Sequence, residues 1–161
     1  MSGAPHLDVR LVVLVAGGGA VGTAARYLLS GLLPPAAGWP VGTLTANVLG
    51  SFLLGALLEA LLRRGAESRR GRRVRLAVGT GILGGFTTFS SLALELERML
   101  VAGELGTALL YAGVSLLAGV AACFLGIVVA QRHGGRRGIP GSLTRTGQGT
   151  RALAPGEQVG P

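Results

Sequence analysis

Residues 79–91 combine glycine, hydroxyl and aromatic side chains within a stretch that is otherwise apolar. The glycines of this stretch favour a helix that breaks, because each one in a helix interior costs about 1 kcal/mol relative to alanine. A break inside a membrane leaves backbone carbonyls that coordinate cations and N–H groups that attract anions. The sequence therefore predicts an ion site here, and the alternative is a packing face of small residues with ordinary core aromatics.

Side chains beside these glycines add chemistry suited to an anion. Thr87, Thr88 and Ser90 carry hydroxyls, which can donate hydrogen bonds. Phe86 and Phe89 carry aromatic rings, whose edges are electropositive. A phenylalanine edge can therefore face an anion without supplying a fixed positive charge.

Two other apolar stretches each carry a polar stripe at four-residue spacing, which places its members on one helix face. The first stripe is Thr43, Asn47, Ser51 and Gly55, and the second is Tyr111, Ser115 and Gly119. The Asn47 amide can donate two hydrogen bonds to an anion, and the second stripe could line a narrow path. For both stripes, hydrogen bonding between helices is the alternative.

The first apolar stretch holds a Gly-x-x-x-Gly pair, Gly18 and Gly22, followed by Arg26 on the same helix face. The glycine pair predicts close helix packing. An arginine within a span faces protein or water rather than lipid. Arg26 therefore either anchors the structure or raises the local concentration of anions.

The elements that position these residues are four long apolar stretches. The chain has 161 residues, of which 49% are hydrophobic and 14% charged, and its mean hydropathy is +0.57. A soluble domain carries about 25% charged residues, and about 20 apolar residues cross a bilayer as a helix. The sequence predicts an all-α integral membrane protein with a broken third helix. The predicted spans are 11–33, 41–62, 74–100 and 105–130, between an N-terminal segment 1–10 and a disordered Arg/Gly-rich tail 131–161.

The formal charge of +8 comes from fifteen basic residues, all of them arginine. Four spans place thirteen of the fifteen on one side of the membrane, and Arg98 alone falls on the other side. Arginine-rich short loops stay in the cytoplasm, so both termini are expected to be cytoplasmic. The basic loop 63–75 is then a topology signal that contacts lipid headgroups. A nucleic-acid partner is not expected, because aromatic residues do not interleave the arginines.

Enzymatic chemistry is not indicated. Cys123 is the single cysteine, which excludes a disulfide framework and a cysteine-based metal site. The sequence offers no ATP site, no nucleophile–base pair and no cluster of metal-binding side chains, so any flow of ions should be passive.

Three motifs together resemble the Fluc (CrcB) family of fluoride channels. They are Gly-Gly-Gly-Ala-Val-Gly at 17–22 with Arg26 following, Gly-Thr-Leu-Thr-Ala-Asn-Val-Leu-Gly-Ser-Phe at 42–52, and Gly-Gly-Phe-Thr-Thr-Phe-Ser at 84–90. They occur in the family's order, and the resemblance covers residues 11–130.

The resemblance implies four-helix subunits that pair antiparallel, in a dual-topology type of dimer with two fluoride pores. It implies a structural sodium ion, not transported, held by backbone carbonyls of Gly84 and Thr87. Asn47 matches the pore asparagine and Phe89 the first of two paired pore phenylalanines. Tyr111 and Ser115 fall on the family's polar track.

Two positions depart from the family pattern. Leu92 stands at the second pore phenylalanine, and Gly119 stands where many members have serine. One of the two pores that the subunit helps to build is therefore expected to be impaired. Because the arginine bias also fixes orientation, the sequence predicts a dimer with an oppositely oriented homologous subunit.

The predicted function is passive efflux of fluoride across the cell membrane, which lowers cytoplasmic fluoride and its toxicity. Asn47, Ser90, Tyr111 and Ser115 would donate hydrogen bonds to the dehydrated ion, and Phe89 would add an edge contact. The alternative is a proton-coupled four-span exporter of small molecules. That chemistry needs a carboxylate deep in the membrane, whereas Glu59, Glu95 and Glu97 lie near the ends of the predicted spans.

Overall fold

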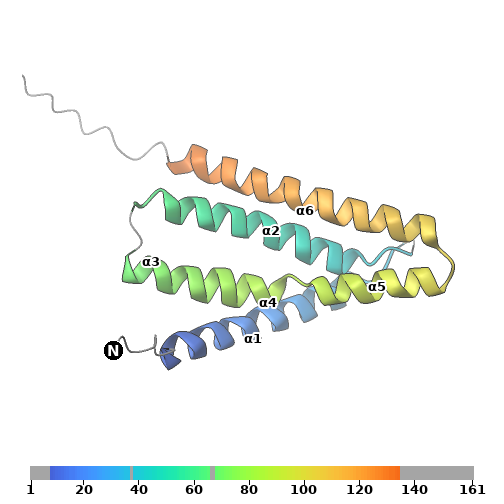
Figure 1. Cartoon of the computed structure of the whole chain (residues 1–161), viewed down its shortest axis with the longest axis horizontal. Helices are drawn as coiled ribbons and strands as arrows, with labels where there is room; N and C mark the ends of the chain where they lie inside the picture. Colours follow the sequence, from blue (N-terminus) through green and yellow to red (C-terminus); the bar gives the residue numbers. More distant parts are fainter. Residues whose placement is uncertain (1–7, 37, 66–67, 135–161) are drawn as a thin grey trace, which may run out of the picture.

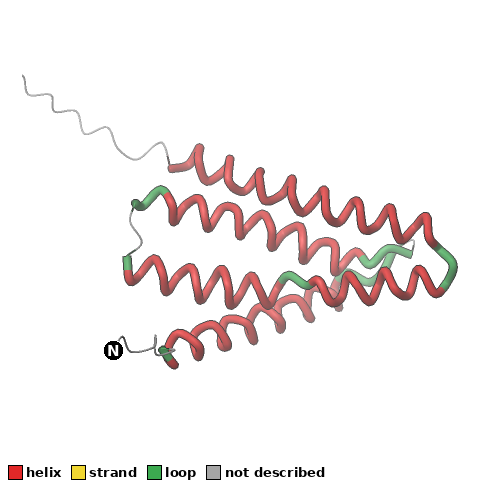
Figure 2. The backbone as a smooth tube through the Cα atoms, in the orientation of Figure 1, coloured by secondary structure: helices red, strands yellow, loops and turns green. Residues whose placement is uncertain are grey.

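The computed structural model describes residues 8–36, 38–65 and 68–134. In this part of the chain four helical rods lie side by side (Figure 1), joined by short loops (Figure 2). The elements are α1 (Val9–Leu32), α2 (Val41–Leu62), α3 (Arg69–Val74), the π-helix η1 (Arg75–Leu83), α4 (Gly84–Phe86), α5 (Phe89–Val101) and α6 (Leu105–Gly134). The third rod is composed of α3, η1, α4 and α5.

All four rods are long and apolar enough to cross a membrane, with mean hydropathies between 1.3 and 2.4. The prediction of an all-α integral membrane protein with four spans is therefore confirmed. The third rod begins at Arg69, before the predicted boundary, because the Ser68 hydroxyl caps α3 by accepting a hydrogen bond from the Gly71 N–H at 3.0 Å. Helix α6 continues through Gly134, whereas the rest of the predicted tail lies outside the described residues.

Helix α1 contacts the third rod through bare backbone. A Cβ atom on Gly18 would stand 2.5 Å from the Ala77 carbonyl oxygen, and one on Gly22 would stand 2.0 Å from that of Ile82. Side chains at these positions would collide with backbone that cannot rotate away. The close packing that the Gly-x-x-x-Gly pair predicts is thus confirmed.

Helices α2 and α6 approach each other in the same manner. A Cβ atom on Gly55 would lie 2.3 Å from the Cys123 carbonyl oxygen, and one on Gly126 would lie 2.1 Å from that of Phe52. The two helices run side by side along their lengths (Figure 1). Glycines therefore set the spacing of both helix pairs.

The glycine-rich part of the third rod stays helical, in the widened turns of η1 and the short α4. The backbone leaves helical geometry just beyond it, at Thr87 (φ −78°, ψ 154°) and Thr88 (φ −150°, ψ 122°). Wide π-type turns are common at functional sites. Here only α4 separates them from the extended residues.

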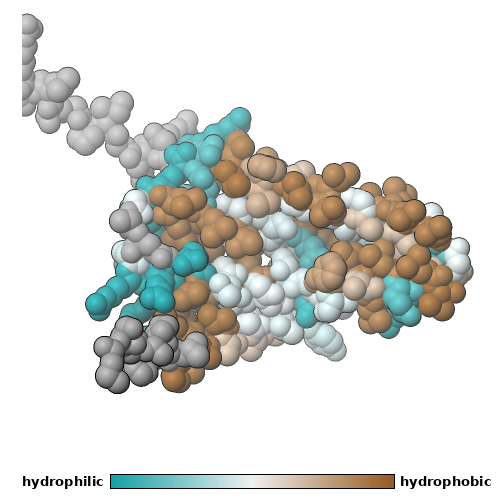
Figure 3. Space-filling model, in the orientation of Figure 1, coloured by the Kyte–Doolittle hydropathy of each residue, from teal (hydrophilic) through white to brown (hydrophobic). Residues whose placement is uncertain are grey.

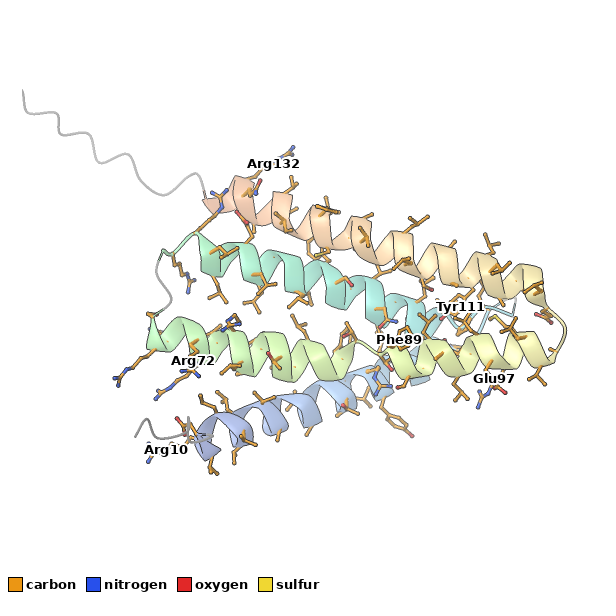
Figure 4. All side chains as sticks on the ribbon, in the orientation of Figure 1. Arg10, Arg72, Phe89, Glu97, Tyr111 and Arg132 are labelled. Atoms are coloured by element: carbon orange, nitrogen blue, oxygen red, sulfur yellow. The ribbon has the colours of Figure 1, made fainter. Side chains whose placement is uncertain are left out.

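Most of the described arginines collect at one end of the bundle, the exceptions being Arg26 and Arg98. Arg10, Arg72 and Arg132 lie at the end where α1 begins and where α2 and α6 finish (Figure 4). Figure 3 shows hydrophilic residues at this end and hydrophobic residues along much of the remaining length. The bundle therefore has one strongly basic end, as expected from the placement of arginine in the sequence.

Candidate functional site

The centre of the site is the interruption of the third rod at Thr87 and Thr88. The Leu83 carbonyl accepts hydrogen bonds from both the Thr87 N–H and the Thr87 hydroxyl, each at 2.9 Å. These two bonds close the last turn of α4. The chain then runs extended through Thr88 before α5 begins at Phe89.

Asn47 of α2 pairs with the backbone of Thr88 through both ends of its amide. Its Nδ2 donates to the Thr88 carbonyl at 3.0 Å, and its Oδ1 accepts from the Thr88 N–H at 2.7 Å. The amide thus replaces the helical partners that Thr88 lacks, which are costly to leave unpaired in a membrane. One of the two Nδ2 hydrogens is used in this way, and the other can serve a ligand.

A small network of hydroxyls follows the break. The Thr88 hydroxyl oxygen accepts from the Ser91 N–H at 3.1 Å and caps the start of α5. It also lies 3.1 Å from the Ser90 oxygen and 3.2 Å from the Ser91 oxygen. The hydroxyls of Thr88, Ser90 and Ser91 therefore form one cluster, in which Ser90 is exposed, whereas the Thr87 hydroxyl is bound to Leu83.

Two backbone carbonyls at the break lose their usual helical donors. The donor that a helix would give to the Gly84 carbonyl is the Thr88 N–H, which is bound to Asn47 instead. The corresponding donor for the Thr87 carbonyl is the Ser91 N–H, which is bound to the Thr88 hydroxyl. Carbonyl oxygens are suitable ligands for a hard cation. The Gly84 and Thr87 carbonyls thus fit the sodium site that the family resemblance implies.

Arg26 and Thr23 connect α1 to the same region. The Arg26 Nε and the Thr23 hydroxyl each donate to the Gly85 carbonyl at 3.4 Å, and Arg26 Nη1 lies 3.5 Å from the Ser91 oxygen. Arg26 therefore has the contacts of an anchor, and its positive charge lies beside the break. This position is compatible with both expected roles for Arg26, which are to anchor the structure and to raise the local concentration of anions.

A second polar group joins α2, α5 and α6 through Glu95. Its carboxylate accepts from the Thr43 hydroxyl at 2.5 Å and from the Tyr111 hydroxyl at 2.7 Å. The Tyr111 side chain is fully buried and meets the Trp39 ring edge-on, with centroids 5.7 Å apart. Sequence reasoning placed Glu95 near a span end and missed this group, because Thr43 and Tyr111 come from distant stripes.

Ser115 extends this buried polar face by one turn of α6. It is 6% exposed, and its oxygen has no hydrogen-bond partner among the residues the structure describes. A buried hydroxyl without a partner is unfavourable, so Ser115 is available to a ligand. One turn further, a Cβ on Gly119 would lie an ordinary 3.6 Å from the Ser51 oxygen.

The two positions of the family's phenylalanine pair have different environments. Phe89 is 81% exposed at the start of α5, and Figure 4 places it next to the break. Leu92 instead packs against the core cluster of Met99, Ala108 and Tyr111. The residue that departs from the family pattern is thus part of the interior of this chain.

Among the predicted site residues, Asn47, Thr87 and Ser90 come together at the break with Arg26 beside them. Tyr111 and Ser115 form a separate buried face on α6, connected to α5 through Glu95. The two groups supply hydrogen-bond donors, aromatic edges and only a few charges. Such a set suits passage of a small ion better than covalent chemistry.

Four apolar spans define a multi-pass membrane protein, in which uncharged hydrogen-bond donors gather at the interruption of the third span. The family model for the CrcB-like protein, Camphor Resistance (CrcB), matches residues 13–127. The chain therefore belongs to the CrcB family.

Curated relatives cover most of the chain. A protein of Leifsonia xyli named fluoride-specific ion channel FluC 2 is 47% identical over 134 residues, which span 83% of this chain and 92% of the relative. Proteins named fluoride-specific ion channel FluC from Caulobacter vibrioides and Pyrococcus furiosus are 46% and 45% identical, over 75% and 78% of this chain and 95% and 100% of their own lengths. These similarities do not favour a proton-coupled exporter.

Proposed function

We propose that this chain is a subunit of a fluoride-specific ion channel that lets fluoride leave the cytoplasm passively. The relatives carry that name, and the chain is accordingly a channel subunit and not an enzyme. The observation that carries the proposal in the structure is the pairing of Asn47 with Thr88 at 3.0 and 2.7 Å. It holds an extended segment, with its hydroxyls and Phe89, inside a membrane span.

The ion path uses two sets of donors. Near the break, the free Nδ2 hydrogen of Asn47, the Ser90 hydroxyl and the edge of Phe89 contact fluoride. Along α6, fluoride meets the Ser115 hydroxyl, which has no partner among the described residues, and passes the Tyr111 hydroxyl, whose single hydrogen is donated to Glu95. Fluoride is small and strongly hydrated, so each lost water must be replaced by a donor, and a larger halide cannot approach the same donors as closely.

Glu95 tunes the second set of donors. Its carboxylate accepts from both Thr43 and Tyr111, so it engages the single hydrogen of each of these two hydroxyls. A negative carboxylate repels fluoride unless its charge is engaged by donors. The two short hydrogen bonds partly compensate the negative charge of Glu95, so the surface beside the path is polar but repels fluoride less.

A sodium ion at Gly84 and Thr87 would have a structural role. Support for it comes from the two carbonyls whose helical donors are diverted to Asn47 and Thr88. Two carbonyls are too few for a hard cation, which takes about six oxygen ligands. A second subunit must therefore contribute, and the bound ion would join the two broken spans.

The dimer is proposed to pair this chain with an oppositely oriented homologue. Phe89 is 81% exposed, and a pore-lining ring on the surface of one chain requires a partner to enclose the path. The basic end of the bundle supports an orientation with both termini in the cytoplasm, because arginine-rich segments stay there. An identical copy in the opposite orientation would have to move its own basic end across the membrane.

Fluoride and chloride efflux from liposomes tests the proposal. We expect little flux from the chain alone, and fluoride efflux without chloride efflux when it is co-reconstituted with an oppositely oriented homologue. Strong fluoride flux from the purified single protein would contradict the need for a homologous partner but would agree with the channel function. Chloride efflux equal to fluoride efflux, or no fluoride efflux with any partner, would contradict the channel itself.

A further inference from the structure

A pocket of about 550 Å³ opens at the basic end of the bundle, between the end of α2 and the start of the third rod. It is hereafter the α2–α3 pocket. Its apolar wall is Leu58, Leu61 and Leu62, and its cationic rim is Arg64, Arg70 and Arg75. The volume is within the range of about 300–1,000 Å³ that ligand sites occupy. Neither the fluoride path nor the sodium site uses these residues.

Local backbone structure places the arginines at the rim. Gly65 ends α2 with a positive φ of 81°, and its N–H bonds to the Leu62 carbonyl at 3.2 Å, as glycine does at many helix ends. Ser68 then caps α3, whose residues include Arg70. Two helix ends therefore bring Arg64 and Arg70 to the same pocket.

Two arginines of the rim, Arg64 and Arg70, carry charge that no acid compensates in the part of the chain that the structure describes. Glu59, one turn before Arg63, pairs with that arginine at 2.6 Å and so does not neutralise the rim. Arg64 and Arg70 are exposed and form no ion pair with an acid among the described residues. Guanidinium groups bind phosphate oxygens with two parallel hydrogen bonds.

The leucines show which phosphate compound fits. Leu62 is 74% exposed and Leu58 is 37% exposed, and the step of four positions between them spans about 6 Å along the helix. The apolar wall thus extends from the arginine rim towards the membrane interior. A free phosphate would leave this wall bare, whereas an acyl chain would cover it.

We infer that the α2–α3 pocket binds one anionic phospholipid, with its phosphate at Arg64 and Arg70 and an acyl chain along Leu58 and Leu62. The site follows from an apolar wall and a cationic rim meeting at the end of a membrane span, where a lipid has its headgroup. The bound lipid would hold the end of α2 against the start of the third rod.

Native mass spectrometry of the detergent-purified protein tests the site by counting retained lipids. The probe is palmitoyl-oleoyl phosphatidylglycerol, compared with the zwitterionic phosphatidylcholine of the same chains. We expect one retained phosphatidylglycerol per chain, and an apparent affinity that falls by about tenfold or more in Arg64→Gln/Arg70→Gln, because each arginine strengthens binding severalfold.

The matched control is Arg72→Gln/Arg73→Gln. It removes the same charge from the same region, but neither residue lines the pocket, so the affinity should change by less than about threefold if a site rather than bulk charge binds the lipid. Leu58→Trp is a second variant that keeps every arginine and fills the apolar wall. It should also reduce retention.

Three outcomes would overturn the inference. They are equal retention of phosphatidylcholine, an equal loss in the Arg72/Arg73 control, and one-for-one displacement of the lipid by soluble glycerol 3-phosphate. The last would make the pocket an anion site without lipid specificity. Lipid counting does not depend on conduction, so failure of the proposed channel function would leave this result unaffected.

Discussion

The third rod contacts its neighbours differently on the two sides of its interruption. Before Thr87, η1 and α4 meet α1 through backbone, where a Cβ atom on Gly22 would stand 2.0 Å from the Ile82 oxygen. After Thr88, α5 meets α2 and α6 through a carboxylate that accepts two hydroxyl hydrogen bonds, from Thr43 and Tyr111. The first half of the span contacts α1 through close backbone packing, and the second half is hydrogen-bonded to α2 and α6 through polar side chains.

This difference separates the residues that stabilise the fold from the residues that serve ion conduction. Backbone contact gives close packing and tolerates no added atom. Hydrogen-bonding side chains pack less closely, yet they can exchange one partner for another. Substitutions before the break should therefore affect folding, and substitutions at or after it should affect conduction in a folded protein.

The largest effect should come from Gly22→Ala. The new Cβ would collide with the Ile82 backbone, and overpacking of this severity costs about 3 kcal/mol or more. We expect loss of the folded species in size-exclusion chromatography and thermal unfolding in detergent. Gly17→Ala is the control, because a Cβ there meets no atom within 4 Å. If the two variants are equally stable, backbone contact does not hold this half of the span.

Asn47→Asp should nearly abolish fluoride flux in a protein that still folds. The carboxylate cannot donate to the Thr88 carbonyl and adds a negative charge beside the path, so we expect a loss of at least about a hundredfold. Fluoride efflux from liposomes that also contain the oppositely oriented homologue measures it. Asn47→Ala loses both hydrogen bonds to Thr88 but adds no charge, and it should conduct more than Asn47→Asp. Unchanged efflux in Asn47→Asp would remove this residue from the path.

Tyr111→Phe should have an intermediate effect on flux. It removes one of the two donors to Glu95, and a hydrogen bond to a charged group is worth about 1.5 kcal/mol or more, so a decrease of about tenfold is expected. Tyr27→Phe is the matched control, because Tyr27 is 78% exposed and makes no contact with this group. Equal efflux from both variants would place the Tyr111 hydroxyl outside the mechanism.

The smallest effect should come from Gly119→Ser. A Cβ at this position has room, 3.6 Å from the Ser51 oxygen, so the stability should not fall. The added hydroxyl would extend the donor stripe of Tyr111 and Ser115, and we expect efflux to rise by up to about threefold, as for one weak hydrogen bond. A decrease in efflux would mean that glycine is required there.

Residues whose roles depend on their own helix could be predicted from the sequence, whereas residues whose partners are on other helices could not. The helical spans depend on apolar length, and Gly18 and Gly22 act within one helix face, so both were evident beforehand. Glu95 was not, because its partners come from two other helices. Asn47 was singled out as a donor, but its two bonds to the Thr88 backbone depend on where the third span breaks.

By itself the sequence determined the four spans, the concentration of arginine at one end and the family. The physical reason is that each of these properties depends on the composition of single segments, and that a membrane excludes charged residues from the segments that cross it. Only the tertiary structure decided that the break lies at Thr87 and Thr88, that Asn47 closes it, and that Glu95 collects two hydroxyls. These features depend on distances between residues that are far apart in the chain, which glycine-controlled helix spacing sets.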